Sequence, residues 1–144
     1  MRVGLVEQEA YPYRSKTGHS YACRKDIVED DRVKKYKIEG FRMLPTGSCQ
    51  AIQVELSKGH TVAAMIAAGE LSYYRQSETR AFRNCPKEPF NHAITIVGQT
   101  EKKEWIVRNS WGASFAQNGY FIMKGGNTCG VCTHGIVPYL KENQ

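Results

Sequence analysis

Long apolar runs, repeats and low-complexity segments are missing from this sequence, and each absence narrows the class of protein. No apolar run approaches the about 20 residues that a membrane-spanning helix requires, so we expect no membrane-spanning segment. The first nine residues lack the apolar centre of a signal peptide and already carry acidic side chains. We therefore expect any export signal of the parent protein to lie outside this chain.

Acidic residues are fewer than basic ones, 14 against 20, which leaves a formal net charge of +6. The basic residues are scattered, and the main cluster, residues 32–37, follows the acidic residues 29–31 that offset it. No nucleic-acid-binding motif accompanies the charge, so we interpret it as a solvated surface and expect neither a nucleic acid nor a membrane as partner. At 144 residues, 41% hydrophobic and 24% charged, the chain is one soluble domain able to bury a core.

The chain has five cysteines, and an odd number indicates either a free thiol or a bond to another chain. Metal binding is the competing use, because Cys129 and Cys132 have the spacing of zinc ligands. No second pair of cysteines or histidines with ligand spacing accompanies them. We therefore expect no metal and no other cofactor.

Strands dominate the expected secondary structure, and nearly all of them follow residue 36. One helix is predicted over 48–58, with Ser48 as its N-cap and Gly59 as its stop. Apolar and β-branched runs predict the strands, and a second helical turn is predicted over 70–74. The predicted strands are 36–44, 61–68 (a buried strand), 93–98, 105–109, 119–123 and 136–139. The simplest fold is mostly β, of the α+β family: an antiparallel sheet closing toward a barrel, with one or two short helices.

A histidine and an asparagine carry the chemistry. His92 opens one apolar run, and Asn109 closes the next one 17 residues later. A cysteine nucleophile reacts as the thiolate, which a neighbouring imidazolium stabilises, and the imidazole needs a group that orients its other nitrogen. A neutral amide oxygen can do this, and an adjacent indole, here Trp111, shields that hydrogen bond from water. The pair therefore indicates half of a Cys-His-Asn site, although a histidine at a strand end and Asn-Ser-Trp-Gly as a plain turn remain the alternative.

These segments resemble the papain family of cysteine peptidases, in its cathepsin-like form. The resemblance is to the C-terminal half of the family, and it covers nearly the whole of this chain. The matching segments are Gly4-Leu5, Glu7, Tyr11-Pro12-Tyr13 with Cys23, Asn91-His92-Ala93-Ile94, Val97-Gly98, Trp105 to Gly112, Asn118-Gly119-Tyr120-Phe121 and Asn127-Thr128-Cys129-Gly130-Val131.

The resemblance implies a fold and a role for each residue. Residues 1–144 would form the second lobe of the family fold, a distorted antiparallel β-barrel, and residues 1–35 would pack on a helical first lobe. His92 would be the base, Asn109 its orienter and Trp111 the shield. Residues near the pocket for the second residue before the scissile bond would be Ala64, Asn91 and Ala93.

The resemblance also implies a use for each cysteine. Cys85 and Cys129 would form the disulfide of the second lobe. Cys23 would bond to a cysteine of the first lobe, and Cys49 and Cys132 would remain as extra thiols.

The nucleophile is the missing part of the pattern. In this family it precedes the histidine and asparagine by roughly 130–150 residues, which places it before Met1. Gly47-Ser48-Cys49-Gln50-Ala51 is similar to the family's nucleophile segment, and Cys49 lies at a predicted helix N-terminus, where the thiol pKa falls. Cys49 precedes His92 by only 43 residues, however, and the segment fits the short helix of the second lobe better.

Two functions remain open. The chain is either the second lobe of a thiol protease that hydrolyses polypeptides with a separate first-lobe chain, or a non-catalytic relative used as a binding or structural module in a larger assembly. Residues 114–117 depart from the family's Gly-Trp-Gly-Glu and put binding of the leaving-group side in doubt, and Asn91 replaces the commoner Asp. In both cases an exposed apolar face predicts a partner. The family's habit implies a lysosomal, vacuolar or secreted protein.

Overall fold

The structure, a computed structural model, describes residues 4–75, 80–86 and 89–140. The chain divides into two units, Met1–Phe41 with Pro138–Gln144 and Arg42–Val137, and each is described by itself. Within the described residues, none of the helices is both long and apolar enough to cross a membrane.

The smaller unit consists of short elements and has no core of its own. Strand β1 (Leu5–Val6) pairs antiparallel with β2 (Lys35–Tyr36), and between them lie a short 3-10 helix, η1 (Ser15–Thr17), and one turn of helix, α1 (Lys25–Val28). No described residue of this unit is buried. Its polar contacts are local, such as the ion pair of Arg24 with Asp26.

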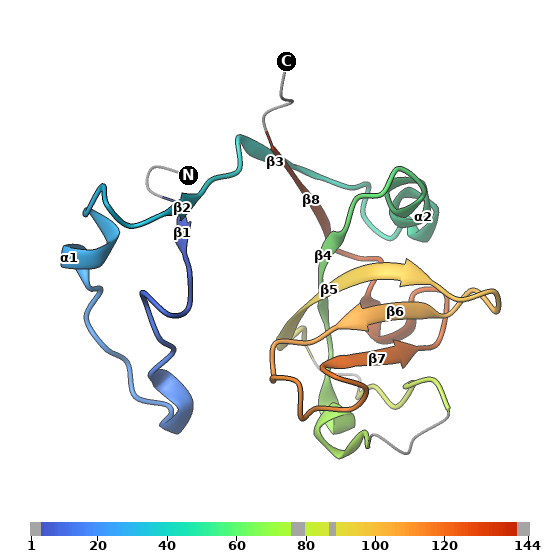
Figure 1. Ribbon diagram of the computed structural model, residues 1–144. Helices are drawn as coiled ribbons and strands as arrows, with labels where there is room; N and C mark the ends of the chain where they lie inside the picture. The colour runs from blue at the N-terminus through green and yellow to red at the C-terminus, as the bar shows by residue number, and fades with distance from the viewer. Residues whose placement is uncertain (1–3, 76–79, 87–88, 141–144) are drawn as a thin grey trace. The chain divides into compact units, whose positions relative to one another are not determined.

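The larger unit is built on one sheet, in the order β3-β8-β4-β5-β6-β7 (Figure 1). The pairings of β4 with β5 and β8, of β5 with β6 and of β6 with β7 are antiparallel, as predicted. In the described residues β3 and β7 remain as the two edges, so the sheet is open, whereas the sequence predicted one that closes toward a barrel. The strands are β3 (Gly40–Met43), β4 (Val62–Ile66), β5 (His92–Gln99), β6 (Trp105–Arg108), β7 (Tyr120–Met123) and β8 (Gly135–Tyr139).

The single strand predicted over 36–44 is two strands, β2 and β3. Gly40 begins the second one, where a Cβ atom would lie 2.2 Å from the Tyr139 hydroxyl. A larger residue at position 40 would displace the Tyr139 side chain. The single predicted strand is thus interrupted before this glycine.

Helix α2 (Cys49–Ser57) confirms the predicted helix. The Ser48 side chain accepts a hydrogen bond from the Ala51 backbone N–H at 3.1 Å, which is the expected N-cap. After Lys58, Gly59 adopts a φ of 83°, a left-handed conformation that ends the helix at little cost for glycine. The helix packs against β4 and β5. Two short 3-10 helices, η2 (Gly69–Tyr73) and η3 (Thr128–Gly130), complete the unit.

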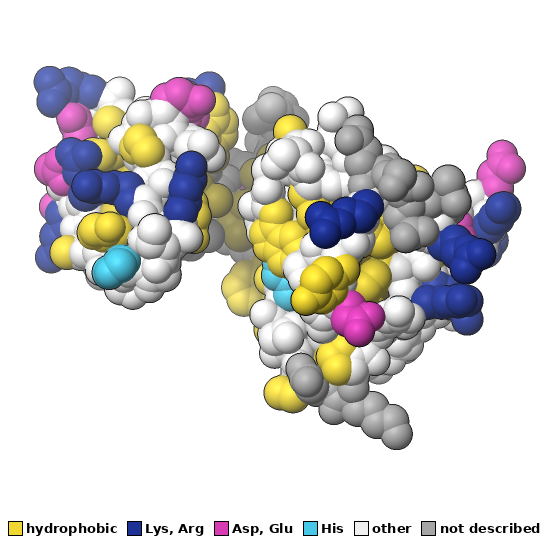
Figure 2. Space-filling view, turned by 90° about the horizontal axis from the view of Figure 1, so that it is seen from below, with side chains coloured by type: hydrophobic (Ala, Val, Ile, Leu, Met, Phe, Trp, Pro, Cys, Tyr) yellow, Lys and Arg dark blue, Asp and Glu magenta, His cyan; other side chains and the backbone are white. Residues whose placement is uncertain are grey.

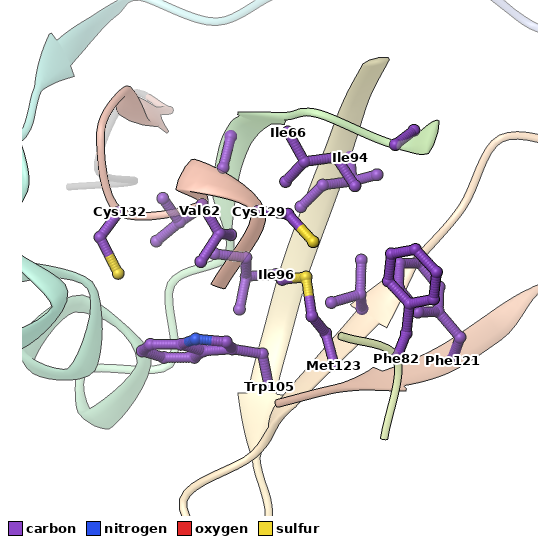
Figure 3. Packing of buried hydrophobic residues seen from close by; sticks show 14 of the residues in the cluster. Val62, Ile66, Phe82, Ile94, Ile96, Trp105, Phe121, Met123, Cys129 and Cys132 are labelled. Carbon is purple, nitrogen blue, oxygen red and sulfur yellow. The ribbon is translucent and has the colours of Figure 1, made fainter. Parts of the chain in front are cut away.

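The core lies on one face of the sheet. Trp105, Phe121, Ile96 and Met123 are fully buried and belong to one hydrophobic cluster (Figure 3). Complete burial of a side chain of this size contributes about 1.5–3 kcal/mol. Strand β4 alternates between buried and exposed residues, so the prediction of a strand buried throughout is wrong. Because all residues of this strand are apolar, the sequence does not show which of them face the core, and only the pairing with β5 shows the alternation.

Two disulfides hold this unit together. Cys85 is bonded to Cys129, and Cys49 is bonded to Cys132. The expectation that Cys49 and Cys132 remain as thiols is therefore wrong, and a disulfide-bonded Cys49 has no thiolate to act as a nucleophile. Cys23, in the smaller unit, is exposed and is the free cysteine among the described residues. Two disulfides fit an oxidising compartment.

Candidate active site

His92 lies at the first position of β5, opposite Ile66 of β4 in the antiparallel register. The neighbouring backbone is tied down on the same edge, because the Asn91 N–H donates to the Ile66 carbonyl at 3.1 Å. The Asn91 side-chain oxygen accepts a hydrogen bond from the Ala68 N–H at 2.8 Å. Two hydrogen bonds therefore hold the residue before His92 against the end of β4 and the segment that follows it.

Asn109 follows the last residue of β6, and the two strands bring it to the imidazole. Its side-chain oxygen lies 2.9 Å from the His92 Nε2 atom. The same oxygen accepts the Ser110 backbone N–H at 2.8 Å, which fixes the orientation of the amide. An oxygen that faces Nε2 requires a proton on Nε2, so in the neutral ring Nδ1 is the nitrogen with a lone pair that can accept a proton.

The Asn109 side chain is only 6% exposed, and its Nδ2 is the buried side-chain polar atom without a hydrogen-bond partner among the described residues. An unpaired buried N–H₂ group is destabilising, by about 1–3 kcal/mol. The Asn109 side-chain oxygen thus accepts hydrogen bonds, whereas its nitrogen donates none among the described residues. A destabilising polar group of this kind is typical of a position that serves a function.

Trp111 covers the imidazole. The centroids of the His92 and Trp111 rings are 4.9 Å apart, with an interplanar angle of 39°. Phe115 packs edge-on against the indole at 5.0 Å and against Phe121 of the core at 6.0 Å. A row of aromatic rings therefore connects the imidazole to the core, and in this row Phe115 lies between the indole and Phe121. Trp111 remains 41% exposed.

The residues expected to line a substrate pocket lie on different faces of the sheet. Ala64 pairs with Ile94 and is 3% exposed, so it belongs to the core. Ala93 is exposed and lies directly opposite Met65, whose side chain is 40% exposed. Residues opposite each other in a sheet share a face, so Met65 is the accessible neighbour of Ala93. Sequence reasoning missed Met65 because the register of β4 against β5 is not visible in an apolar run.

His92, Asn109 and Trp111 are thus brought together, Asn91 supports the strand end beside them, and Ala64 is buried in the core. No group of histidine, cysteine and carboxylate side chains suited to a metal ion is present in the parts of the chain that the structure describes.

Comparison with known proteins agrees with this geometry. The sequence profile of the family described as "Papain family cysteine protease" matches residues 1–139. Cathepsin L 1 of Paramecium tetraurelia is 30% identical over 138 residues, 95% of this chain and 39% of that protein. Mouse cathepsin K is 28% identical over 141 residues, 94% of this chain and 41% of that protein. The chain thus spans about two fifths of the length of these curated relatives.

Solved structures give the same result for the fold. Bromelain from Ananas comosus, solved in complex with the inhibitor E64, superposes with a TM-score of 0.75 and 26% identity over 96% of this chain and 64% of that one. Procathepsin L 3 from Tenebrio molitor superposes with a TM-score of 0.76 and 27% identity over 96% of this chain and 45% of that one. This chain belongs to the papain family of cysteine proteases.

Proposed function

We propose that this chain supplies the general base and its orienting residue to a Cys-His-Asn site that hydrolyses peptide bonds. His92 is the base, Asn109 its orienter, and the nucleophilic cysteine belongs to a first lobe that packs against this one. The observation that carries the proposal is the 2.9 Å hydrogen bond between His92 Nε2 and Asn109 Oδ1, which leaves Nδ1 for the thiol proton.

The reaction follows from this proton placement. The thiol proton moves to Nδ1 of His92, and the thiolate attacks the scissile carbonyl carbon, whose π electrons move to its oxygen. When the tetrahedral intermediate collapses, the C–N bond breaks, and Nδ1 returns the proton to the leaving amine. Water then attacks the resulting thioester, its proton passes to Nδ1, and the acid product leaves as the thiolate forms again.

Asn109 keeps the imidazole in one tautomer and one orientation through both steps. Its oxygen adds no formal charge, so the imidazolium is stabilised by a dipole only. Trp111 covers the ring from one side and lowers access of water to that hydrogen bond.

The exposed residues that follow His92 and precede its partner Ile66 form the substrate surface in this proposal. Ala93 and Met65 are adjacent and exposed there, and they offer apolar contact to a side chain of the bound polypeptide. Met65 takes the place that the sequence predicted for Ala64. The Asn91 side-chain oxygen already accepts the Ala68 N–H, so in this proposal Asn91 contacts the substrate through its backbone. Phe115 stands where the family pattern has a tryptophan. The smaller ring reduces the surface that can contact the leaving-group side of the substrate.

A first-lobe chain is the proposed partner, and Cys23 is its proposed covalent link. Cys23 is exposed and free, while the other four cysteines form two disulfides. The described part of the smaller unit buries none of its residues, which is unusual for a segment that is stable without a neighbour. We place the protein in an oxidising compartment, lysosomal, vacuolar or secreted.

An epoxide that alkylates catalytic thiols, such as E64, tests the proposal in the protein isolated from its source. We expect one equivalent of label on a cysteine that is not among the five of this chain, and no label in the His92→Ala variant. Label on Cys23 would place the nucleophile in this chain and contradict the two-lobe arrangement.

The second candidate is a non-catalytic module of the same family. Residues 114–117, which depart from the family pattern, favour it. Absence of any label in a preparation that contains a first lobe, with no peptide hydrolysis, would support this function and overturn the first.

A further inference from the structure

The turn that carries Cys129 has an unfavourable backbone conformation. Within η3, Cys129 has a φ of 55°, and Gly130 follows with a φ of 76°. Glycine adopts this left-handed region readily, whereas a residue with a Cβ atom is destabilised there. Cys129 is 8% exposed and belongs to the hydrophobic cluster (Figure 3). Its conformation is therefore imposed by its surroundings, and such positions are often part of a switch.

The Cys85–Cys129 disulfide is the covalent restraint on this residue. It attaches Cys129 to a segment 44 residues earlier in the chain. The hydrogen bonds from Gly130 N–H to the Asn127 carbonyl and from Val131 N–H to the Thr128 carbonyl lie within the turn itself, both at 3.1 Å. If the disulfide opens, only non-covalent contacts hold Cys129 in the left-handed region.

The same turn supports the segment that presents the base. The Cys129 carbonyl accepts a hydrogen bond from the Ala67 N–H at 3.0 Å. The next residue, Ala68, donates its N–H to the Asn91 side-chain oxygen at 2.8 Å. Asn91 directly precedes His92, so two hydrogen bonds and two peptide bonds connect Cys129 to the base.

A packing contact gives a second connection. A Cβ atom on Gly130 would lie 2.3 Å from Cε1 of Phe90, so the turn lies directly against this ring. Phe90 also contacts His134 edge-on, with the ring centroids 5.2 Å apart, and it precedes His92 by two residues. A change in the backbone of Cys129 would therefore alter both the hydrogen bond and the packing that position the start of β5.

One sulfur of this disulfide can be reached from solvent. Cys85 is half-buried and lines an open hollow of about 670 Å³, which is large enough for a small thiol. The lining residues are Gly69, Glu70, Asn84, Cys85 and Pro86. Figure 2 shows the larger unit from the side where η2 lies in Figure 1, and hydrophobic side chains, the class that includes cysteine, reach the surface there. Accessible disulfides are the ones that thiols reduce most readily.

The backbone favours opening of this disulfide over the other one. Reduction lets Cys129 leave the left-handed region, and this relief of strain favours the reduced state. Neither Cys49 nor Cys132 has a positive φ, so their reduction brings no such relief.

We propose that Cys85–Cys129 is a reducible switch on the His92 base, opened by a small thiol of the glutathione class. The thiolate of the reductant attacks Cys85 Sγ and forms a mixed disulfide, and Cys129 leaves as a thiolate that takes up a proton. A second thiolate attacks the sulfur of the reductant in the mixed disulfide and releases Cys85, which also takes up a proton. Two thiols are thereby oxidised to one disulfide while two protein cysteines are reduced.

Reduction weakens the positioning of the base. Cys129 relaxes to a negative φ, its carbonyl leaves the Ala67 N–H, and the turn withdraws from Phe90. His92 then no longer keeps its alignment with the Asn109 side-chain oxygen. This inference rests on the proposed role of His92 as the base, and it adds redox control to that site.

Equilibration of the whole protein in a series of glutathione buffers, from oxidising to reducing, tests the switch. Acid quenching, alkylation and mass spectrometry measure the reduced fraction of each disulfide, and ¹⁵N chemical shifts report the tautomer of the His92 ring. We expect Cys85–Cys129 to open before Cys49–Cys132, and the His92 ring to lose its preference for a proton on Nε2 in step with that opening. Opening of both disulfides at the same glutathione ratio, or a ring signal that does not follow Cys85–Cys129, would overturn the inference.

Two variants separate the conformation of the turn from the covalent bond. Cys85→Ser/Cys129→Ser mimics the reduced state, whereas the glycine of Cys85→Ser/Cys129→Gly adopts a φ near 55° at little cost. Both variants lack the disulfide, and melting temperatures verify that they fold. In one glutathione buffer, which keeps the nucleophile in the same state, we expect kcat/KM for a fluorogenic peptide to be about tenfold lower in the serine variant than in the glycine variant.

The two measurements distinguish failure of the switch from failure of the proposed function. Equal peptide hydrolysis by the two variants would overturn the switch and leave the protease function intact. The ring signal is recorded without a substrate. A His92 ring that responds to reduction as expected, in a protein without peptide hydrolysis, would support the switch and count against the protease function alone.

Discussion

The side-chain oxygen of Asn109 is the most informative single atom of this molecule. It accepts two hydrogen bonds, from Ser110 N–H and from His92 Nε2, and the first of these determines that the second is made by oxygen. The tautomer of the histidine therefore follows from a backbone contact one residue away.

Replacing Asn109 with Ala removes this acceptor. We expect the His92 imidazole to lose its preference for a proton on Nε2, which ¹⁵N chemical shifts of the ring report directly. In the active two-lobe protein we expect kcat/KM to fall about 100-fold, the usual cost of a misplaced catalytic group. Asn84→Ala, at an exposed position, is the control. An unchanged tautomer in Asn109→Ala would contradict the orienting role.

Phe115 supports Trp111, and the Phe115→Ala variant tests this. We expect the indole to become mobile and the free energy of unfolding to fall by about 2 kcal/mol, since Phe115 is only partly buried. With 5-fluorotryptophan, the ¹⁹F resonance of Trp111 should shift and broaden while that of the fully buried Trp105 stays in place. A shift of both resonances would indicate general loosening of the core, and Phe41→Ala, at an exposed site, should move neither.

At the scale of elements, helix α2 is fastened to the sheet by a buried carboxylate. Glu55 is 3% exposed and contacts Arg42, Lys58 and His60. The hydrogen bond from His60, followed by those from Arg42 and Lys58, lowers the pKa of Glu55 from 4.5 to about 2, against the opposing effect of burial. Ion pairs of Glu55 thus add to the apolar packing of helix α2, and the sequence did not indicate them.

A lowered carboxyl pKa makes stability depend on pH in a definite direction. The stabilisation from Glu55 is complete above the unfolded-state pKa of about 4.5, and it is lost as the pH falls toward the folded-state pKa of about 2. Urea unfolding at pH 6 and pH 3 should therefore show a smaller loss on acidification in Glu55→Gln than in the natural protein, by about 1–2 kcal/mol. The control Glu39→Gln, at an exposed site, should lose as much stability on acidification as the natural protein. An identical loss in all three proteins would contradict a lowered pKa of Glu55.

The Cys49–Cys132 disulfide attaches the start of α2 to the segment after η3, across 83 residues of sequence. The Cys85–Cys129 bond lies within the loop that Cys49–Cys132 closes and shortens that loop. We therefore expect the double variant Cys49→Ser/Cys132→Ser to lose about 3 kcal/mol of unfolding free energy. Chemical denaturation measures this. A loss below about 1 kcal/mol would mean that the packing of Ile52 and the ion pair of Glu55 with Arg42 hold the helix without this disulfide.

At the scale of the whole molecule, local signals in the sequence predicted most of the larger unit. The capping serine and the stop glycine located α2, and the strands that carry His92 and Asn109 were located by their β-branched and aromatic residues. The pairing of His92 with Asn109 was predictable because a hairpin brings residues near its open end together.

Features that depend on distant contacts could not be predicted in this way. The Cys49–Cys132 bond joins segments 83 residues apart, and no local pattern encodes that approach. Whether Ala64 or Met65 faces outward depends on the register of β4 against β5. The open sheet likewise depends on whether the two edge strands meet, and alternation within single strands does not determine that.

The central claim is that His92 serves as the base of a thiol protease, and turnover of a fluorogenic peptide by the isolated two-lobe protein tests it most directly. We expect His92→Ala to lower kcat by at least about 1,000-fold, as loss of the base does in a nucleophile-base-orienter site, with the fold intact. His19→Ala, in the smaller unit, should keep full activity. Turnover by His92→Ala at the rate of the natural protein would contradict the account.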